Sequence, residues 1–167
     1  MVEVGARDAL QHALLDRLTD HDPTRKVEGR DERVLSRAQL RAAVLRDLAW
    51  LFNSTNLSSS VDLSAHPLAA QSTLNYGLPA LAGHTVAGLE FAEVERILKE
   101  AILRFEPRIL PHSLSVRGVQ PKDPTGHHNV MSLEISGELW SQPYPLEFLI
   151  KTDMDLESGE IRLVEGR

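Results

Sequence analysis

The sequence predicts an α+β fold in which N-terminal helices pack on a three- to four-stranded antiparallel meander. Apolar residues recur at helical spacing as far as residue 105, and they alternate with polar residues from residue 114 onward. Pro107 stands between the two patterns and ends the last helix. Helices followed by successive short strands are typical of a sheet covered on one face. With 167 residues, 42% of them hydrophobic, the chain is long enough for one core, so we expect a single domain over residues 1–167.

The N-terminal segment predicts one helix and one long loop. The helix is expected from Ala9 to Leu18 with Asp8 as its N-cap, and its apolar stripe consists of Leu10, Leu14 and Leu18. Residues 19–35 are polar and charged, contain proline and glycine, and show no sustained period. They therefore predict a long loop, and the residues before the helix predict a flexible N-terminus.

A second, longer helix is expected from Ser36 to Asn53. Ser36 and Gln39 have the spacing of a capping box, in which each side chain bonds the backbone of the other residue. The stripe that would face the core contains Leu40, Val44, Leu48 and Leu51. Pro67 suits the first turn of a short helix that ends near Gly77, because proline is tolerated at that position and glycine favours a helix end.

The third long helix is expected over residues 88–105. Its inward side contains Val94, Ile97, Leu98, Ala101, Ile102 and Phe105. On its outer side we expect two i,i+4 ion pairs, Glu95–Lys99 and Glu100–Arg104. A turn over residues 157–160 precedes the last of four predicted strands, which lie near residues 114–116, 131–139, 146–156 and 161–164.

Composition excludes several classes of protein. The net charge of −6 argues against binding nucleic acid through its phosphates, because such binding requires a basic surface. The chain contains no cysteine, which excludes disulfides and thiolate metal sites. Its start lacks a signal-peptide pattern, and no run of about 18 apolar residues would span a membrane. We therefore expect a cytoplasmic protein without direct membrane insertion.

No metal or cofactor site is expected from the sequence. His127 and His128 lie in a predicted loop, but adjacent histidines rarely chelate one ion and no second ligand pair has the spacing of a zinc site. Asp153, Asp155 and Glu157 resemble a calcium loop only superficially, since the rest of the twelve-residue pattern is absent. The chain also contains no P-loop, dinucleotide-binding or nucleophile-elbow motif.

Glu106, Pro107 and Arg108 form the most informative motif. Proline fixes its own φ and pushes the preceding residue out of the α region, so an acid and a base are held at a helix-to-strand junction. Such a junction suggests either a recognition point at the surface or a catalytic carboxylate. A nearby cation favours the ionised form of a carboxylate, which is the wrong form for a general acid. Local ion pairing between Glu106 and Arg108 is the simplest alternative.

Five segments taken together resemble one family. They are Leu14-Leu-Asp-Arg-Leu18, Leu45-Arg-Asp-Leu-Ala-Trp-Leu-Phe-Asn53, Leu74-Asn-Tyr-Gly-Leu-Pro79, Arg104-Phe-Glu-Pro-Arg108 and Glu134-Ile-Ser-Gly-Glu-Leu-Trp140. In this order and at these intervals they are similar to TssE, the type VI secretion baseplate proteins of the phage baseplate-wedge, or tail lysozyme-like, family. The resemblance covers nearly the whole chain from Leu14 onward.

The resemblance implies a structural adaptor and not an enzyme. Such an adaptor links the baseplate wedge to the contractile sheath and helps start sheath polymerisation, with TssF, TssG and TssK as partners. It implies a partner-binding role for Glu106, Pro107 and Arg108. The open edge of a meander can also accept a partner strand, and the expected edge is the terminal strand, Ile161, Arg162, Leu163 and Val164. The competing hypothesis is a peptidoglycan-cleaving, lysozyme-like enzyme that uses Glu106.

Overall fold

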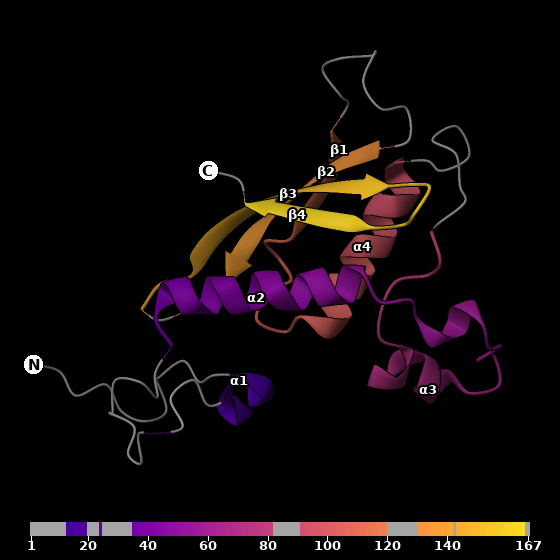
Figure 1. The fold of residues 1–167 in the computed structure, drawn as a ribbon, viewed down its shortest axis with the longest axis horizontal. Helices are drawn as coiled ribbons and strands as arrows, with labels where there is room; N and C mark the ends of the chain where they lie inside the picture. Colours follow the sequence, from indigo (N-terminus) through magenta and orange to yellow (C-terminus); the bar gives the residue numbers. More distant parts are fainter. Residues whose placement is uncertain are drawn as a thin grey trace, which may run out of the picture.

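Helices pack on one four-stranded antiparallel sheet in the computed structural model of the protein (Figure 1). The structure describes residues 13–19, 24, 35–81, 91–119, 130–141 and 143–165. The strands lie in the sheet in the order in which they follow along the chain, namely β1 (Ser115–Val119), β2 (Val130–Leu139), β3 (Leu146–Asp155) and β4 (Ile161–Glu165). This arrangement confirms the predicted α+β fold, and the meander has four strands.

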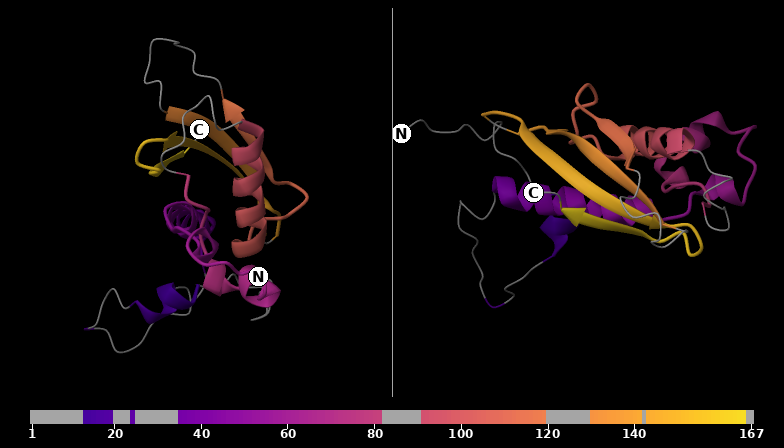
Figure 2. Two further views of the ribbon diagram at one scale, coloured as in Figure 1. Left: turned by 90° about the vertical axis from the view of Figure 1, so that its right-hand side faces the viewer. Right: turned by 90° about the horizontal axis from the view of Figure 1, so that it is seen from above.

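Two long helices contact the two edge strands of the sheet. Helix α2 (Arg37–Phe52) lies beside β4, and helix α4 (Phe91–Phe105) lies beside β1 (Figures 1 and 2). The five-residue α1 precedes α2, and three short elements connect α2 to α4. Their bounds are α1 (Leu14–Leu18), η2 (Leu57–Ser59), α3 (Pro67–Gln71) and η3 (Thr73–Asn75). The predicted first turn of the third long helix, residues 88–90, lies outside the described residues.

Helix α2 begins and ends where the sequence predicts. The Gln39 N–H donates to Ser36 Oγ (3.2 Å), and the Ser36 N–H donates to Gln39 Oε1 (2.9 Å), which completes the capping box. Asn53 is the C-cap. The predicted stripe is buried, since none of its four residues is more than 2% exposed; these are Leu40, Val44, Leu48 and Leu51. The apolar periodicity and the capping residues therefore predict the same helix, and the structure contains it.

The core lies between the helices and one face of the sheet. Alternate residues of the central strands are buried because successive side chains of a strand point to opposite faces. Cross-strand pairs on that face include Met131 with Met154 and Ile135 with Ile150. They pack in one cluster with the inward residues of α4, which are Val94, Leu98, Ala101 and Ile102. The opposite face is polar. On it Arg117 of β1 lies opposite Glu134 of β2, and Glu134 lies opposite Lys151 of β3.

The backbone at Gly77 lies against the backbone at Ser54, and this contact positions the segment between the two long helices. Gly77 has a φ of +114°, and a Cβ at this position would lie 2.3 Å from the carbonyl oxygen of Ser54. The Leu78 N–H donates to that same Ser54 oxygen (2.8 Å). Glycine is required here both by the backbone conformation and by the close contact. The predicted short helix begins at Pro67 but ends at Gln71, six residues before Gly77.

The prediction of an apolar stripe on the first helix is wrong for the part that the structure describes. Leu14 and Leu18 are 71% and 74% exposed. The side chain of α1 that contacts the body is Asp16, which is paired with Arg46 of α2, so the polar side of α1 faces the domain. Asp8, Leu10 and nearly all of the predicted loop at 19–35 lie outside the described residues.

The ion pairs of α4 also differ from those predicted from spacing, Glu95–Lys99 and Glu100–Arg104. Arg96 bonds Glu100 (2.8 Å) and also Glu93 (2.7 Å), because its forked guanidinium reaches one turn in each direction. Glu95 instead accepts a hydrogen bond from the β1 backbone. Spacing identified the charged side of the helix but not the partners.

Candidate functional site

The Glu-Pro-Arg motif joins the end of α4 to the sheet. Helix α4 ends at Phe105, and the Glu106 N–H still donates to the Ile102 carbonyl (2.8 Å). Beyond Pro107, the carbonyl of Arg108 accepts a hydrogen bond from the Trp140 N–H (2.8 Å), just after β2 ends. The motif is therefore anchored to a helix on one side and to the sheet on the other, as the predicted helix stop requires.

Glu106 is buried, which corrects the expectation of a carboxylate at the surface. Only 4% of the residue is exposed. Its Oε1 accepts hydrogen bonds from Arg108 Nε (2.6 Å) and from the Arg108 backbone N–H (3.2 Å), and its Oε2 accepts from Arg108 Nη2. Residues two apart can form this bidentate pair because the proline between them turns the chain. The local ion pair considered from the sequence is present, but in the interior.

Three further charged residues extend this pair into a ladder. Arg108 Nη2 also donates to Asp47 Oδ2 of α2 (2.5 Å), and Asp47 Oδ1 accepts from Arg46 Nη2 (2.8 Å). Arg46 in turn pairs with Asp16 of α1. We call the five residues Asp16, Arg46, Asp47, Glu106 and Arg108 the charge ladder. It connects α1, α2 and the end of α4 through side chains that lie far apart in the sequence.

The two carboxylates beside Arg108 keep its guanidinium charged. Burial lowers the pKa of Arg108, but the hydrogen bonds and charges of Glu106 and Asp47 outweigh burial and raise that pKa above its ordinary value. Charge-assisted, bidentate contacts of this kind are stronger and more directional than neutral hydrogen bonds. The guanidinium is therefore held in a defined orientation.

A hollow of about 400 Å³ lies beside the ladder. We call it the Trp50 hollow, since the Trp50 ring is 48% exposed and carries the Arg46 guanidinium 4.9 Å from its centroid. Tyr76 packs edge-on against Phe105 (5.2 Å between centroids), and burial raises its pKa. The lining residues are Ala13, Asp47, Leu48, Trp50, Leu51, Tyr76, Phe105, Glu106, Pro107 and Arg108.

Strand β4 forms one edge of the sheet, and its first residue is already paired outside the sheet. Ile161 donates its N–H to Asn53 Oδ1 (3.0 Å) and accepts at its carbonyl from Asn53 Nδ2 (2.9 Å). In an antiparallel ladder the backbone groups alternate between the two sides of a strand, so those of Leu163 and Glu165 also point away from β3. The predicted edge strand therefore has outward groups available beyond the Asn53 contact.

Strand β1 forms the other edge, where α4 covers it. The Gly118 N–H donates to Glu95 Oε1 (2.6 Å). A Cβ on Gly118 would lie 2.1 Å from the Phe91 ring, so the helix packs directly on this strand. Natural proteins commonly protect sheet edges in this way. Each edge strand thus has one residue whose outward backbone is bonded by a side chain of a long helix or its cap, namely Gly118 of β1 and Ile161 of β4.

A scan against protein families matches residues 38–144, more than half of the chain, to the family described as baseplate wedge protein gp25. The chain belongs to the baseplate wedge protein gp25 family. This confirms the wedge-family resemblance and assigns the chain a structural role in a baseplate with other baseplate proteins. A search of curated proteins and a search of solved structures returned no match. The matched span contains α2, α4, the Glu-Pro-Arg motif, β1 and β2, and it ends before β3.

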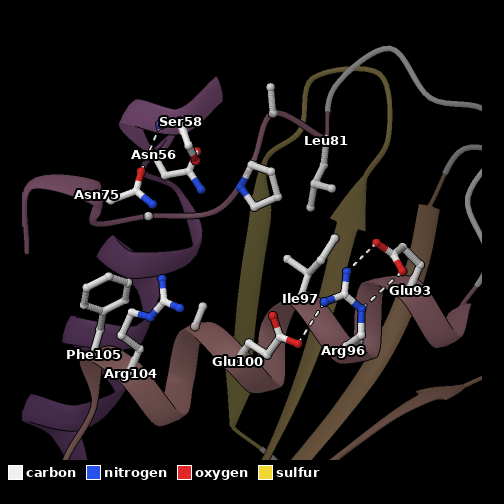
Figure 3. A pocket seen from close by; sticks show the side chains of 14 residues that line it. Asn56, Ser58, Asn75, Leu81, Glu93, Arg96, Ile97, Glu100, Arg104 and Phe105 are labelled. Atoms are coloured by element: carbon white, nitrogen blue, oxygen red, sulfur yellow. Dashed lines mark hydrogen bonds and ion pairs between the residues drawn. The ribbon is translucent and has the colours of Figure 1, made fainter. Parts of the chain in front are cut away.

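A second hollow of this wedge-family domain, about 780 Å³, runs along α4 (Figure 3). Its lining includes Arg96, which forms ion pairs with both Glu93 and Glu100. Asn75 on the opposite wall is buried and serves the fold, since its Oδ1 accepts from the Ser58 N–H (2.9 Å). These contacts favour a structural role over a site of chemistry.

The geometry disfavours the lysozyme-like alternative for the wedge-family chain. A glycosidase acid must reach its substrate and deliver a proton. Both carboxylate oxygens of Glu106 accept hydrogen bonds from Arg108, and the residue is almost completely buried. Within the described ranges, no three His, Asp or Glu side chains gather as a metal site would require, and no described helix is long and apolar enough to cross a membrane. His127 and His128 lie outside the described residues.

Sequence reasoning missed five residues of the candidate site. Asp16, Arg46 and Asp47 complete the ladder, Trp50 lines the hollow, and Asn53 holds the start of β4. All but Asp16 lie in the segment 45–53, which carried part of the family resemblance. The sequence signal that could have identified Arg46 and Asp47 was a base and an acid side by side in a helix whose inner side is otherwise apolar.

Proposed function

We propose that the chain is a TssE-type component of a type VI secretion baseplate. In this proposal it acts in the cytoplasm as one wedge domain, links the wedge proteins TssF, TssG and TssK to the contractile sheath, and helps start sheath polymerisation. The wedge-family match supports the baseplate part of the proposal. The further steps rest on two separate features of the domain.

The observation that carries the proposal is that α2 joins two docking features. Asp47 belongs to the charge ladder next to Glu106, Pro107 and Arg108, and Asn53 holds the open edge at Ile161. Asn53 follows Asp47 by six positions, which is about 9 Å along the helix axis. A rigid helix that contacts both features fixes their relative position, as a protein that connects two assemblies requires.

We propose that the Glu-Pro-Arg motif docks on the wedge and that β4 receives a strand of the first sheath ring. Strand addition uses unpaired backbone groups for affinity, and side chains beside them for specificity. Leu163 presents such groups, whereas Arg162 is 75% exposed at its side chain and pairs with Glu160. Charges on an edge strand discourage indiscriminate pairing while they permit a matched partner.

The test replaces Leu163 with proline in a strain that carries a fluorescent sheath. The Leu163 N–H points away from β3, so Leu163→Pro removes an outward donor and is expected to leave the domain folded. Cells should then contain fewer sheaths although the baseplate still contains the protein. Arg162→Pro is the matched control, because it removes an inward donor and should lower the melting temperature. Normal sheath number and length with folded, baseplate-bound Leu163→Pro would exclude this edge as the starting point.

A further inference from the structure

The Trp50 hollow has the properties of a binding surface and not of a packing defect. Its rim residue Trp50 leaves almost half of its surface in solvent, although an indole ring contributes a large stabilisation when it is covered. Its lining also includes Leu51, Tyr76, Phe105 and Pro107. Exposed tryptophans beside a pocket are typical of residues that dominate protein interfaces.

One donor of the Arg108 guanidinium remains available at this hollow. Its Nε and Nη2 are bonded to Glu106 and Asp47, whereas its Nη1 donates no hydrogen bond to any residue that the structure describes. The Arg108 side chain is 25% exposed. Because Glu106 holds one side of the planar guanidinium and Asp47 holds its Nη2, the direction of Nη1 is fixed. The lining of the hollow thus combines apolar side chains with an arginine whose Nη1 has no partner among the described residues.

The charges around the hollow restrict what can bind. The ladder comprises three carboxylates, those of Asp16, Asp47 and Glu106, and two guanidinium groups, those of Arg46 and Arg108. The whole chain has a net charge of −6. An acidic partner would be repelled, whereas a neutral backbone carbonyl next to basic residues is electrostatically complementary.

We propose that the Trp50 hollow receives an apolar side chain from a wedge protein, that Arg108 Nη1 donates to a backbone carbonyl beside that side chain, and that Asp47 is the positioning residue that orients Arg108. The bound segment carries basic residues next to the apolar one. This inference rests on the proposed function, since it names the partner surface of the same motif. It adds Asp47 and Trp50 to a site for which the sequence indicated Glu106, Pro107 and Arg108.

Asp47 suits the positioning role because it comes from a different element than the motif. Glu106 and Arg108 lie on the same turn, so their pairing alone would let the turn move as a unit relative to α2. The bond from Arg108 Nη2 to Asp47 Oδ2 attaches that turn to α2, and Arg46 holds Asp47 through its other oxygen. Without this attachment Arg108 keeps its charge but loses its fixed direction relative to Trp50.

The experiment measures the affinity of the full chain for a purified TssF–TssG–TssK wedge subcomplex that lacks it. Asp47→Asn keeps the shape of the side chain and removes its charge, and we expect it to weaken binding about tenfold, or about 1.4 kcal/mol. Trp50→Ala should weaken binding by a similar factor without a lower melting temperature. Glu93→Gln is the matched control, because it removes an acid from an exposed arginine pair on α4 and should bind normally.

A double variant separates positioning from a general structural effect. Arg108→Lys keeps a cation beside Glu106 but cannot serve several acceptors with one planar group, so it should also weaken binding. If Asp47 acts through Arg108, the change Asp47→Asn should cost little more in the Arg108→Lys background. A full tenfold loss in that background would overturn the positioning role.

The failure of this inference differs from the failure of the proposed function. If the unaltered chain does not bind the wedge subcomplex, the proposed function is wrong. If it binds and Asp47→Asn or Trp50→Ala binds equally well, the inference about the hollow is wrong while the wedge role stands. Should Asp47→Asn not be folded at the assay temperature, folded Arg108→Lys with unchanged affinity would overturn the inference.

Discussion

Removing the carboxylate of Glu106 is expected to destabilise the isolated domain. Glu106→Ala takes away one member of a buried ion pair and leaves the guanidinium of Arg108 with a single carboxylate partner, Asp47. Breaking a buried pair typically costs about 3–5 kcal/mol. We expect about 3 kcal/mol, at the lower end, because Asp47 remains bonded and a quarter of the Arg108 side chain is in contact with water. For a domain of this size, that loss corresponds to a melting temperature lower by about 6–12 °C.

Urea denaturation and thermal melting, both followed by circular dichroism, measure this effect. Glu106→Gln is the informative companion, because it keeps an acceptor for Arg108 and loses only the charge, so its loss should be smaller. Glu100→Ala is the control for an exposed pair with Arg96 and should leave the transition unchanged. An unaltered melting temperature in Glu106→Ala would refute the reasoning, since it would mean that the buried pair contributes nothing to stability.

Three further outcomes follow from the structure. Leu48→Ala and Ile102→Ala should each destabilise the fold by about 2–5 kcal/mol, measured by urea denaturation, since both side chains are 0% exposed and truncation leaves a cavity; unchanged midpoints would show that the core is placed wrongly. Gly77→Ala should cost more than about 1 kcal/mol in the same assay, because φ is positive there and the new Cβ would meet the Ser54 carbonyl. The pKa of Asp155, measured by NMR titration, should lie below 3.8 because backbone N–H groups of the following turn donate to its carboxylate. The stabilisation from that turn is thus present above pH 3.8 and is lost as the pH falls through the lowered pKa.

Local patterns predicted the regular elements well, because the interactions that form those elements are themselves local. The capping box of Ser36 and Gln39 involves residues three apart, and both its bonds are present. The alternation around Ile135 and Ile150 predicted which face of the sheet is buried, since the period of a strand is two. The helix stop at Pro107 is a property of the proline ring and needs no tertiary contact.

The candidate site was only partly predictable, because its geometry depends on contacts between distant segments. The motif placed Glu106 and Arg108 together, but Arg108 also bonds Asp47, which lies 61 residues before it. Asn53 and Ile161 are separated by 108 residues, so no local pattern indicates their contact. The exposed leucines of α1 have the same explanation, since the partner of Asp16 decides which side of that helix faces the domain.

The proposed strand addition at β4 gives the domain a direction. Protein sheets can be joined into rows when the last strand of one accepts a strand of the next. At β1 the Gly118 N–H is already bonded to Glu95 of α4, whereas the backbone groups of Leu163 in β4 point away from β3. Under the proposed function, a strand that adds at Leu163 makes this domain the first member of such a row. The row then grows away from β4, from a first member that differs from every later one.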